Sequence, residues 1–275
     1  MRRGASIGYL LARTSDTLAD TASAPVEARR SCLDQLCRAI TNHSDAPRWP
    51  VSMLNAIPDP RERQLLESTG SVFEWLEKIP ESEARLIREV FATIASGQLL
   101  DLDRFARAGR EHPVALPDDA ALEDYAWRVA GCVGEFWTKL GFLTLGERFS
   151  NSSESELLSL GRNYGKGLQL VNILRDLPVD LEAGRCYLPV ADPTDRDALL
   201  ACHRQWLARA RKWIGEGKTY AATLNSRRLR AATVLPALLA EKTFDSLTDA
   251  SWDDLLEKIR IPRKAVYQSL ARAFF

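Results

Sequence analysis

Two aspartate pairs with the same internal spacing are the residues of this chain best suited to chemistry. Asp16 and Asp20 lie in YLLARTSDTLAD, and Asp176 and Asp180 lie in LQLVNILRDLPVD. Both stretches are apolar and helix-forming, and residues four apart share one face of a helix. Like charges at this spacing destabilise a helix by roughly 0.2 to 0.5 kcal/mol, so a helix built for stability alone would place Lys or Arg at the fourth position. The pairs therefore predict a cation between the carboxylates.

The late pair belongs to a longer polar stripe. Gln169, Asn172, Asp176 and Asp180 follow one another at intervals of three, four and four on an otherwise apolar helix. Their side chains offer oxygen ligands, which suit hard cations, and magnesium in particular binds one or two carboxylates while keeping water and substrate phosphate oxygens. Two such stripes facing each other would clamp a diphosphate.

Composition excludes several classes of function. The chain has 275 residues with 37 Lys plus Arg against 37 Asp plus Glu, so it has no net basic field for nucleic acid. Its five cysteines are odd in number and form no CxxC pair, which favours a reducing, cytoplasmic setting. His43, His112 and His203 lack the spacing of a helical zinc site and are interpreted as structural. No run is long enough for a membrane span.

The alternation of helical segments with helix-breaking residues predicts an all-α fold. Helical periodicities alternate with Pro, Gly and Ser clusters, and strand signals are nearly absent. Pro178, between Asp176 and Asp180, is expected to kink or end its helix because it lacks an N–H. We expect helices at about residues 4–22, 26–41, 62–78, 82–108, 119–147, 153–182, 195–222, 226–243 and 262–273.

Small residues crowd one predicted helix, YAWRVAGCVGEFW, which spans residues 125–137. Glycine in a helix interior costs up to about 1 kcal/mol, so these positions indicate a close approach of another group. Tight packing of a second helix and contact with a bulky ligand are both compatible with the pattern. Gly161, Gly165 and Gly167 repeat the theme just before the polar stripe.

Four motifs together resemble a known family. DTLAD, YAWRVAGCVGEFW, GKGLQLVNILRDLPVD and GRCYLP occur in this order. In sequence and separation they are similar to the squalene and phytoene synthases, the head-to-head prenyl transferases. DxxxD alone is a weak pattern, whereas QxxNIxRDxxxD followed by GRxYLP is specific, and the likeness covers most of the chain.

The resemblance implies one all-α domain over residues 1–275, an isoprenoid synthase fold whose helices surround a deep apolar cavity with Mg²⁺ at its mouth. Asp16, Asp20, Asn172, Asp176 and Asp180 would hold the metal. The implied diphosphate-binding residues are Arg13, Arg175 and Gln169. Tyr125 would accept a proton or steady the cation, beside the four catalytic aspartates, and Phe136 and Trp137 would either add cation–π attraction or simply fill the core.

The implied reaction joins two prenyl diphosphates through a cyclopropylcarbinyl diphosphate. Two farnesyl diphosphates with NADPH would give squalene, which we favour; geranylgeranyl diphosphate without reductant would give phytoene. A catalytically silent relative that acts as an assembly or interaction factor is a further reading. A terpene cyclase acting on a single prenyl diphosphate fits poorly, because its metal stripe mixes Asn, Ser or Thr and Glu.

The chain departs from the family pattern in two places. Many relatives carry an extra acid where this chain has Ala19 and Val179, so fewer charges hold the metal. A helix with a Ser-Arg pair usually precedes the first motif and is missing here, so we expect a version extended at the N-terminus to be more active. The C-terminal AVYQSLARAFF, with Phe274 and Phe275, would either contact a membrane surface peripherally or dock on the core.

Overall fold

The predicted all-α class is confirmed. The computed structural model describes residues 1–257 and 259–274, and helices account for 75% of the chain. Within the described residues the strands are β1 (Val114–Ala115) and β2 (Arg185–Cys186), which pair in parallel. No helix in this part of the chain is long and apolar enough to cross a bilayer.

The helices follow the chain in a simple order. They are α1 (Arg2–Asp20), α2 (Val26–Thr41), α3 (Val51–Ala56), α4 (Pro60–Glu67), α5 (Thr69–Glu77), α6 (Glu81–Arg104), α7 (Asp119–Ala126), a π-helical turn (Trp127–Gly131), α8 (Cys132–Leu145), a 3-10 turn (Gly146–Arg148), α9 (Glu154–Arg175), α10 (Leu177–Glu182), α11 (Arg196–Thr223), α12 (Arg227–Leu247), α13 (Trp252–Leu256) and α14 (Arg263–Phe274).

The prediction of one helix over residues 62–78 is wrong, because the chain breaks at Ser68 into α4 and α5. The Leu66 carbonyl, which a continuous helix would offer to an N–H four residues on, instead accepts the Thr69 hydroxyl at 2.6 Å and the Trp49 indole N–H at 2.9 Å. Side-chain donors thus replace the helical bond. The short helices α3 and α13 were not predicted either.

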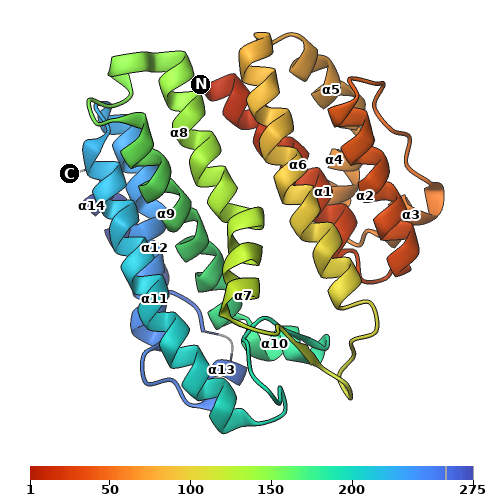
Figure 1. Cartoon of the computed structure of the whole chain (residues 1–275), viewed down its shortest axis with the longest axis vertical. Coiled ribbons are helices and arrows are strands. Elements are labelled where there is room, and N and C mark those ends of the chain that lie inside the picture. The colour runs from red at the N-terminus through yellow and green to blue at the C-terminus, as the bar shows by residue number, and fades with distance from the viewer. Residues whose placement is uncertain (258, 275) are drawn as a thin grey trace. The chain divides into compact units, whose positions relative to one another are not determined.

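Contacts divide the chain into two compact units, which are described separately. The first comprises Met1–Ala106 and Lys139–Thr144. Its helix α1 packs against α2, α4, α5 and α6, and Figure 1 shows α2 and α6 side by side. Ile7, Leu11 and Leu18 recur at helical spacing and are buried, which stabilises this packing by about 1.5–3 kcal/mol per side chain. The prediction of a single domain over residues 1–275 stays a prediction.

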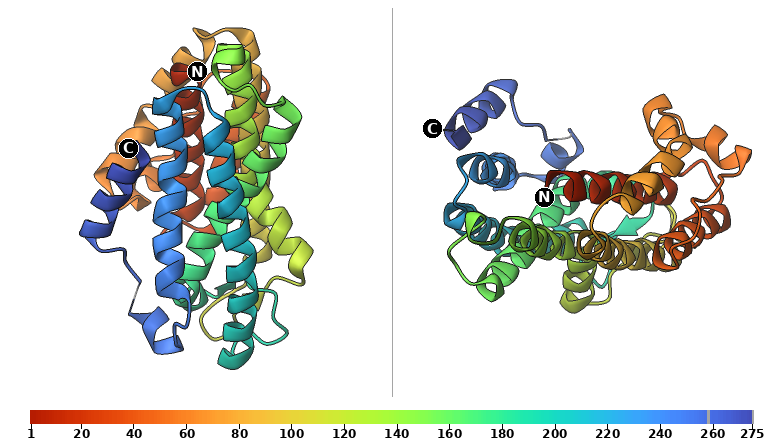
Figure 2. Two further views of the ribbon diagram at one scale, coloured as in Figure 1. Left: turned by 90° about the vertical axis from the view of Figure 1, so that its left-hand side faces the viewer. Right: turned by 90° about the horizontal axis from the view of Figure 1, so that it is seen from above.

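The second unit comprises Arg107–Thr138 and the chain from Leu145 onward. Helix α9 packs against α11 and the π turn, and α11 and α14 pack against α12 (Figures 1 and 2). A Cβ on Gly134 would collide with the Gly161 carbonyl, and one on Gly165 with the Ala130 carbonyl. The glycines therefore let two helix backbones touch, which confirms tight packing at these positions.

Candidate active site

The late aspartate motif sits where two helices meet. Asp176 lies between α9 and α10 and caps both: its N–H donates to the Asn172 carbonyl at 2.9 Å, and its own carbonyl accepts from Asp180 N–H at 3.0 Å. Pro178 lies in the first turn of α10, where a missing N–H does no harm. The helix break predicted from Pro178 is therefore confirmed, and the two aspartates occupy successive turns of a bent path.

Each late aspartate has an arginine partner. Arg175 forms a forked ion pair with its neighbour Asp176, with Nε 2.9 Å from Oδ1 and Nη2 on Oδ2. Arg185, from β2, donates to Asp180 Oδ1 at 3.0 Å. The Asp176 and Asp180 side chains keep 29% and 16% of their surface exposed, so both carboxylates can still be reached from solvent. This part of the second unit alternates anions and cations.

A buried histidine fixes the end of α9 that carries this cluster. His203 on α11 lies with Nε2 3.1 Å from the Leu174 carbonyl oxygen. Burial lowers the pKa of His203, so the ring is neutral near pH 7, with Nε2–H donating. The imidazole thereby satisfies a carbonyl that the helix break would leave without a partner. His203 is structural, as the sequence indicated, although it supports the residue directly before Arg175.

Two tyrosines form a stacked pair in the same unit. Tyr125, near the end of α7, and Tyr187, just after β2, have ring centroids 4.8 Å apart with 19° between the planes, and Tyr125 Oη–H donates to Tyr187 Oη at 3.5 Å. Both side chains are buried. Of the remaining residues in the predicted stripe, Gln169 is half-buried and Asn172 is exposed.

An apolar cavity of about 310 Å³ lies within the second unit. Val133, Trp137, Leu168 and Pro236 are among its lining residues and come from α8, α9 and α12. Phe136 is buried and is not part of this lining. Such a cavity suits a hydrocarbon chain, because its wall offers little that could hydrogen-bond.

The early aspartate motif has different partners. In the first unit, Gln98 of α6 donates from Nε2 to Asp16 Oδ1 at 2.6 Å. Arg13, one turn before Asp16, is ion-paired with Glu62 of α4. Burial, followed by the nearby Asp20 carboxylate, raises the pKa of Asp16 from 3.8 to about 6. Ionised Asp16 is therefore held at a cost, which a bound cation would offset.

Several residues beside these motifs were not predicted from the sequence to have a role. Arg185 and Tyr187 lie in GRCYLP, a motif to which no individual roles were given. Tyr9 precedes Arg13 by four positions and so continues the face of α1 that carries Arg13, Asp16 and Asp20, and it is 67% exposed. Gln98 gave no signal, since nothing in its local sequence relates it to Asp16.

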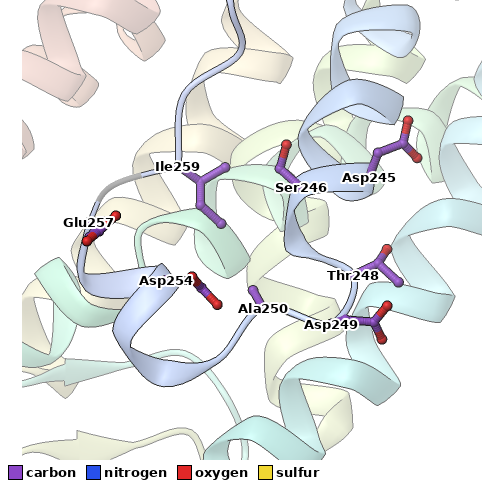
Figure 3. Close-up of a pocket in the computed structure, with 8 residues that line it drawn as sticks. All are labelled: Asp245, Ser246, Thr248, Asp249, Ala250, Asp254, Glu257 and Ile259. Carbon is purple, nitrogen blue, oxygen red and sulfur yellow. The ribbon is translucent and has the colours of Figure 1, made fainter.

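A second pocket, rich in acids, carries no comparable chemistry. Figure 3 shows it between the end of α12 and α13. Asp245 is ion-paired with Arg211 and Lys242, and Asp254 accepts hydrogen bonds from Ser251 at the start of α13. Across the described residues no group of three or more His, Cys, Asp or Glu side chains is arranged to hold a metal. Asp245 and Asp254 thus serve the fold.

The arrangement of helices places the protein in a class, the all-α proteins of isoprenoid synthase fold. A squalene synthase solved with a ligand superposes with a TM-score of 0.78 at 21% identity, over 98% of this chain and 78% of that one. Comparison of the sequence with family profiles identifies the family. The chain belongs to the squalene/phytoene synthase family, whose sequence profile matches residues 1–265.

Curated relatives carry two kinds of name. A presqualene diphosphate synthase from Zymomonas mobilis is 30% identical over 207 residues, which cover 71% of this chain and 65% of the relative. A bifunctional lycopene cyclase/phytoene synthase from Colletotrichum graminicola is 33% identical over 183 residues, 66% of this chain and 29% of the relative. The chain thus spans less than two thirds of the length of either relative. Members of the family are prenyltransferases.

Proposed function

We propose that this protein joins two farnesyl diphosphates head to head, forming the cyclopropylcarbinyl compound presqualene diphosphate and, with NADPH, squalene. One observation carries the proposal: the arginine–aspartate cluster at the end of α9, on the same helix that lines the apolar cavity. A charged end suits a diphosphate and an apolar wall suits its prenyl chain. The relative named presqualene diphosphate synthase supports this substrate class.

Arg175 and Arg13 are the proposed diphosphate ligands. Their side chains are 33% and 42% exposed, and each now pairs with a carboxylate, Asp176 or Glu62. A diphosphate would compete for the same forked donors, because a guanidinium binds phosphate and carboxylate with similar geometry. Gln169, half-buried on α9, is proposed to contact the same end of the substrate.

Five side chains are proposed to bind magnesium. Asp16, Asp20, Asn172, Asp176 and Asp180 offer oxygen ligands, which hard dications prefer. Burial raises the pKa of Asp16 to about 6, so a neighbouring cation would favour its ionised form. When bound, magnesium would supply positive charge that stabilises the departing diphosphate. Arg13 and Arg175 would add to that stabilisation.

The chain's own residues then govern the fate of the carbocation. Departure of diphosphate from C1 of the donor leaves an allylic cation, which the C2–C3 double bond of the acceptor attacks. Loss of a proton from the donor C1 closes the cyclopropane. Tyr125, hydrogen-bonded to Tyr187, is proposed to steady the cation or relay this proton. The apolar side chains of Trp137 and Leu168 are proposed to pack around the bound prenyl chain and to limit the access of water, which would quench the cation to an alcohol.

Phytoene formation from geranylgeranyl diphosphate is the second candidate. The observation that favours it is the similarity to the Colletotrichum graminicola protein, whose name includes phytoene synthase. Both reactions use the same cyclopropyl intermediate, so they differ in chain length and in the need for a reductant.

One assay tests these proposals. The purified protein is incubated with magnesium and either farnesyl or geranylgeranyl diphosphate, with and without NADPH, and the lipid products are identified by mass spectrometry. We expect presqualene diphosphate from farnesyl diphosphate alone and squalene after addition of NADPH. Phytoene would establish the second candidate. Absence of any product and of diphosphate release would leave the silent assembly factor as the explanation.

We further propose that the protein works in the cytoplasm and touches membranes through α14. Tyr267 and Phe274 on this helix are 69% and 49% exposed, although α14 also packs on α12. Phe275 lies outside the described residues. Co-sedimentation with phospholipid vesicles, compared with a Tyr267→Ser and Phe274→Ser double variant, tests the contact: equal sedimentation of both proteins would refute it.

A further inference from the structure

A polar side chain from another helix supports the first aspartate motif. Gln98 lies on α6, which packs along α1 within the first unit, and only 8% of its surface is exposed. Its neighbours Ile94, Ala95 and Leu102 on α6 are buried and apolar. A buried amide in such surroundings is unfavourable unless its polar atoms find partners. The partner of its Nε2 is Asp16 Oδ1, at 2.6 Å.

The chemistry of the two groups fixes how the amide is turned. An ionised carboxylate only accepts hydrogen bonds, so the NH₂ of Gln98 must face Asp16. The Gln98 Oε1 atom then points elsewhere; it is buried and accepts no hydrogen bond from any described residue. A buried acceptor without a donor calls for an explanation. A water molecule bound to a dication would be a suitable donor, because coordination turns its hydrogens outward.

Gln98 gives Asp16 a direct hydrogen bond, whereas the oppositely charged Arg13 acts on Asp16 through space and lowers its pKa. Arg13, on the same face of α1, is ion-paired with Glu62 of α4. The Asp20 carboxylate repels Asp16. A flexible carboxylate between a like charge and solvent would sample several rotamers, whereas a short hydrogen bond to a side chain packed in the core selects one of them.

We propose that Gln98 is a positioning residue of the active site: its amide N–H holds the Asp16 carboxylate in the orientation that binds the dication, and its carbonyl oxygen accepts from metal-bound water. This inference rests on the proposed function, since it needs Asp16 to be a metal ligand. It concerns contacts within the first unit alone. Gln98 acts through Asp16 and through water, and does not touch the prenyl substrate.

The test compares two substitutions of one side chain. Gln98→Met keeps length and removes both polar atoms, whereas Gln98→Glu keeps the shape and replaces the donor by a second acceptor. Thr243→Val serves as the matched control, because it also removes a buried polar group, which bonds only within α12. Each protein is titrated by calorimetry with the thiolodiphosphate analogue of farnesyl diphosphate, which does not ionise, at several magnesium concentrations. Melting temperatures without magnesium report on folding.

We expect Gln98→Met to raise the magnesium concentration that half-saturates analogue binding by about tenfold, the usual effect of losing a group that orients a metal ligand. Gln98→Glu should raise it at least as much, and Thr243→Val should leave it unchanged. Unchanged magnesium dependence in Gln98→Met would overturn the proposal, and so would tighter magnesium binding in Gln98→Glu, which would make residue 98 a ligand itself.

The same titration separates this inference from the proposed function. Asp16→Asn is included, and its binding must weaken if Asp16 holds the dication. If Asp16→Asn weakens binding and Gln98→Met does not, the role of Gln98 fails while the enzyme assignment stands. If neither the wild type nor any variant binds the analogue in a magnesium-dependent way, the proposed function itself is lost, and the positioning role with it.

Discussion

The two aspartate motifs share a spacing and differ in their electrostatic surroundings. In the late motif, Asp176 and Asp180 each pair with an arginine, Arg175 and Arg185. In the early motif, Asp16 receives a neutral amide from Gln98, and burial together with the Asp20 carboxylate raises the pKa of Asp16 to about 6. Identical sequence patterns have thus been placed in two unlike environments.

The two motifs therefore differ in how far their negative charge is neutralised before a ligand binds. The late motif is neutralised internally, so a dication binding there competes with guanidinium groups for the carboxylates. In the early motif, burial disfavours the ionised form of Asp16 more than Arg13 favours it, so a bound cation would stabilise that carboxylate. We infer that Asp16 gains more from the metal and that the late pair contributes more to holding the diphosphate.

The largest effect is expected from neutralising an aspartate of either motif. Asp16→Asn and Asp176→Asn should each lower kcat/KM for farnesyl diphosphate by about 100- to 1000-fold, the range seen when one group that stabilises transition-state charge is removed. Steady-state diphosphate release measures it. Asp253→Asn, an exposed aspartate of α13, is the control and should retain wild-type rates. A fully active Asp16→Asn enzyme would refute a catalytic role for the early motif.

Replacing Asp by Asn should stabilise the folded protein in the early motif and destabilise it in the late motif. The pKa of Asp16 is about 6 in the folded protein and 3.8 in a free side chain, so the folded state binds more protons between these values. Stability is therefore lost as pH rises through that window. Asp16→Asn removes this loss and should stabilise the metal-free protein by about 1–2 kcal/mol at pH 7.5, after allowance for partial exposure, and hardly at pH 4.

Asp176→Asn should do the opposite, because Arg175 loses its forked partner; the loss is at most about 1 kcal/mol for a partly exposed pair. Urea unfolding of both variants at pH 4 and pH 7.5 measures these differences. The electrostatic contrast would be refuted by a gain for Asp16→Asn that is equal at the two pH values, or by a gain for Asp176→Asn.

A smaller effect is expected at the arginine of the late motif. Arg175→Lys keeps the charge and loses the forked geometry, so kcat/KM should fall about tenfold, mostly through KM. The matched control is Arg162→Lys, another ion-paired arginine of α9, whose partner is Glu135. Equal losses in the two variants would mean that Arg175 only stabilises the helix.

The smallest effect concerns the pair that holds Arg13. Glu62→Gln should free this guanidinium for diphosphate and tighten binding of the thiolodiphosphate analogue by up to about threefold, while stability changes by less than about 1 kcal/mol, as for other exposed pairs. Glu81→Gln, which removes the partner of Arg88, provides the comparison. Weaker binding in Glu62→Gln would indicate that Glu62 holds Arg13 in its working position.

Much of the fold followed from local pattern. One helix was predicted over residues 153–182 with a kink or end at Pro178, whose missing N–H is a property of one residue; the chain does break there, at Asp176, and continues as α10. The small residues of residues 125–137 predicted a close approach, and Gly134 against Gly161 confirmed helix packing as its cause. The break at Ser68 was missed, because it depends on the Trp49 indole, which comes from a distant part of the chain.

The sequence by itself determined the all-α class, the face of each helix that carries the aspartates and the family, because periodicity, proline geometry and motif order are properties of neighbouring residues. The tertiary structure alone decided the partners: Gln98 for Asp16, Arg185 for Asp180 and Tyr187 for Tyr125. Each pairing joins different segments of the chain, and the strength of a hydrogen bond or an ion pair depends on distances and burial that only packing sets.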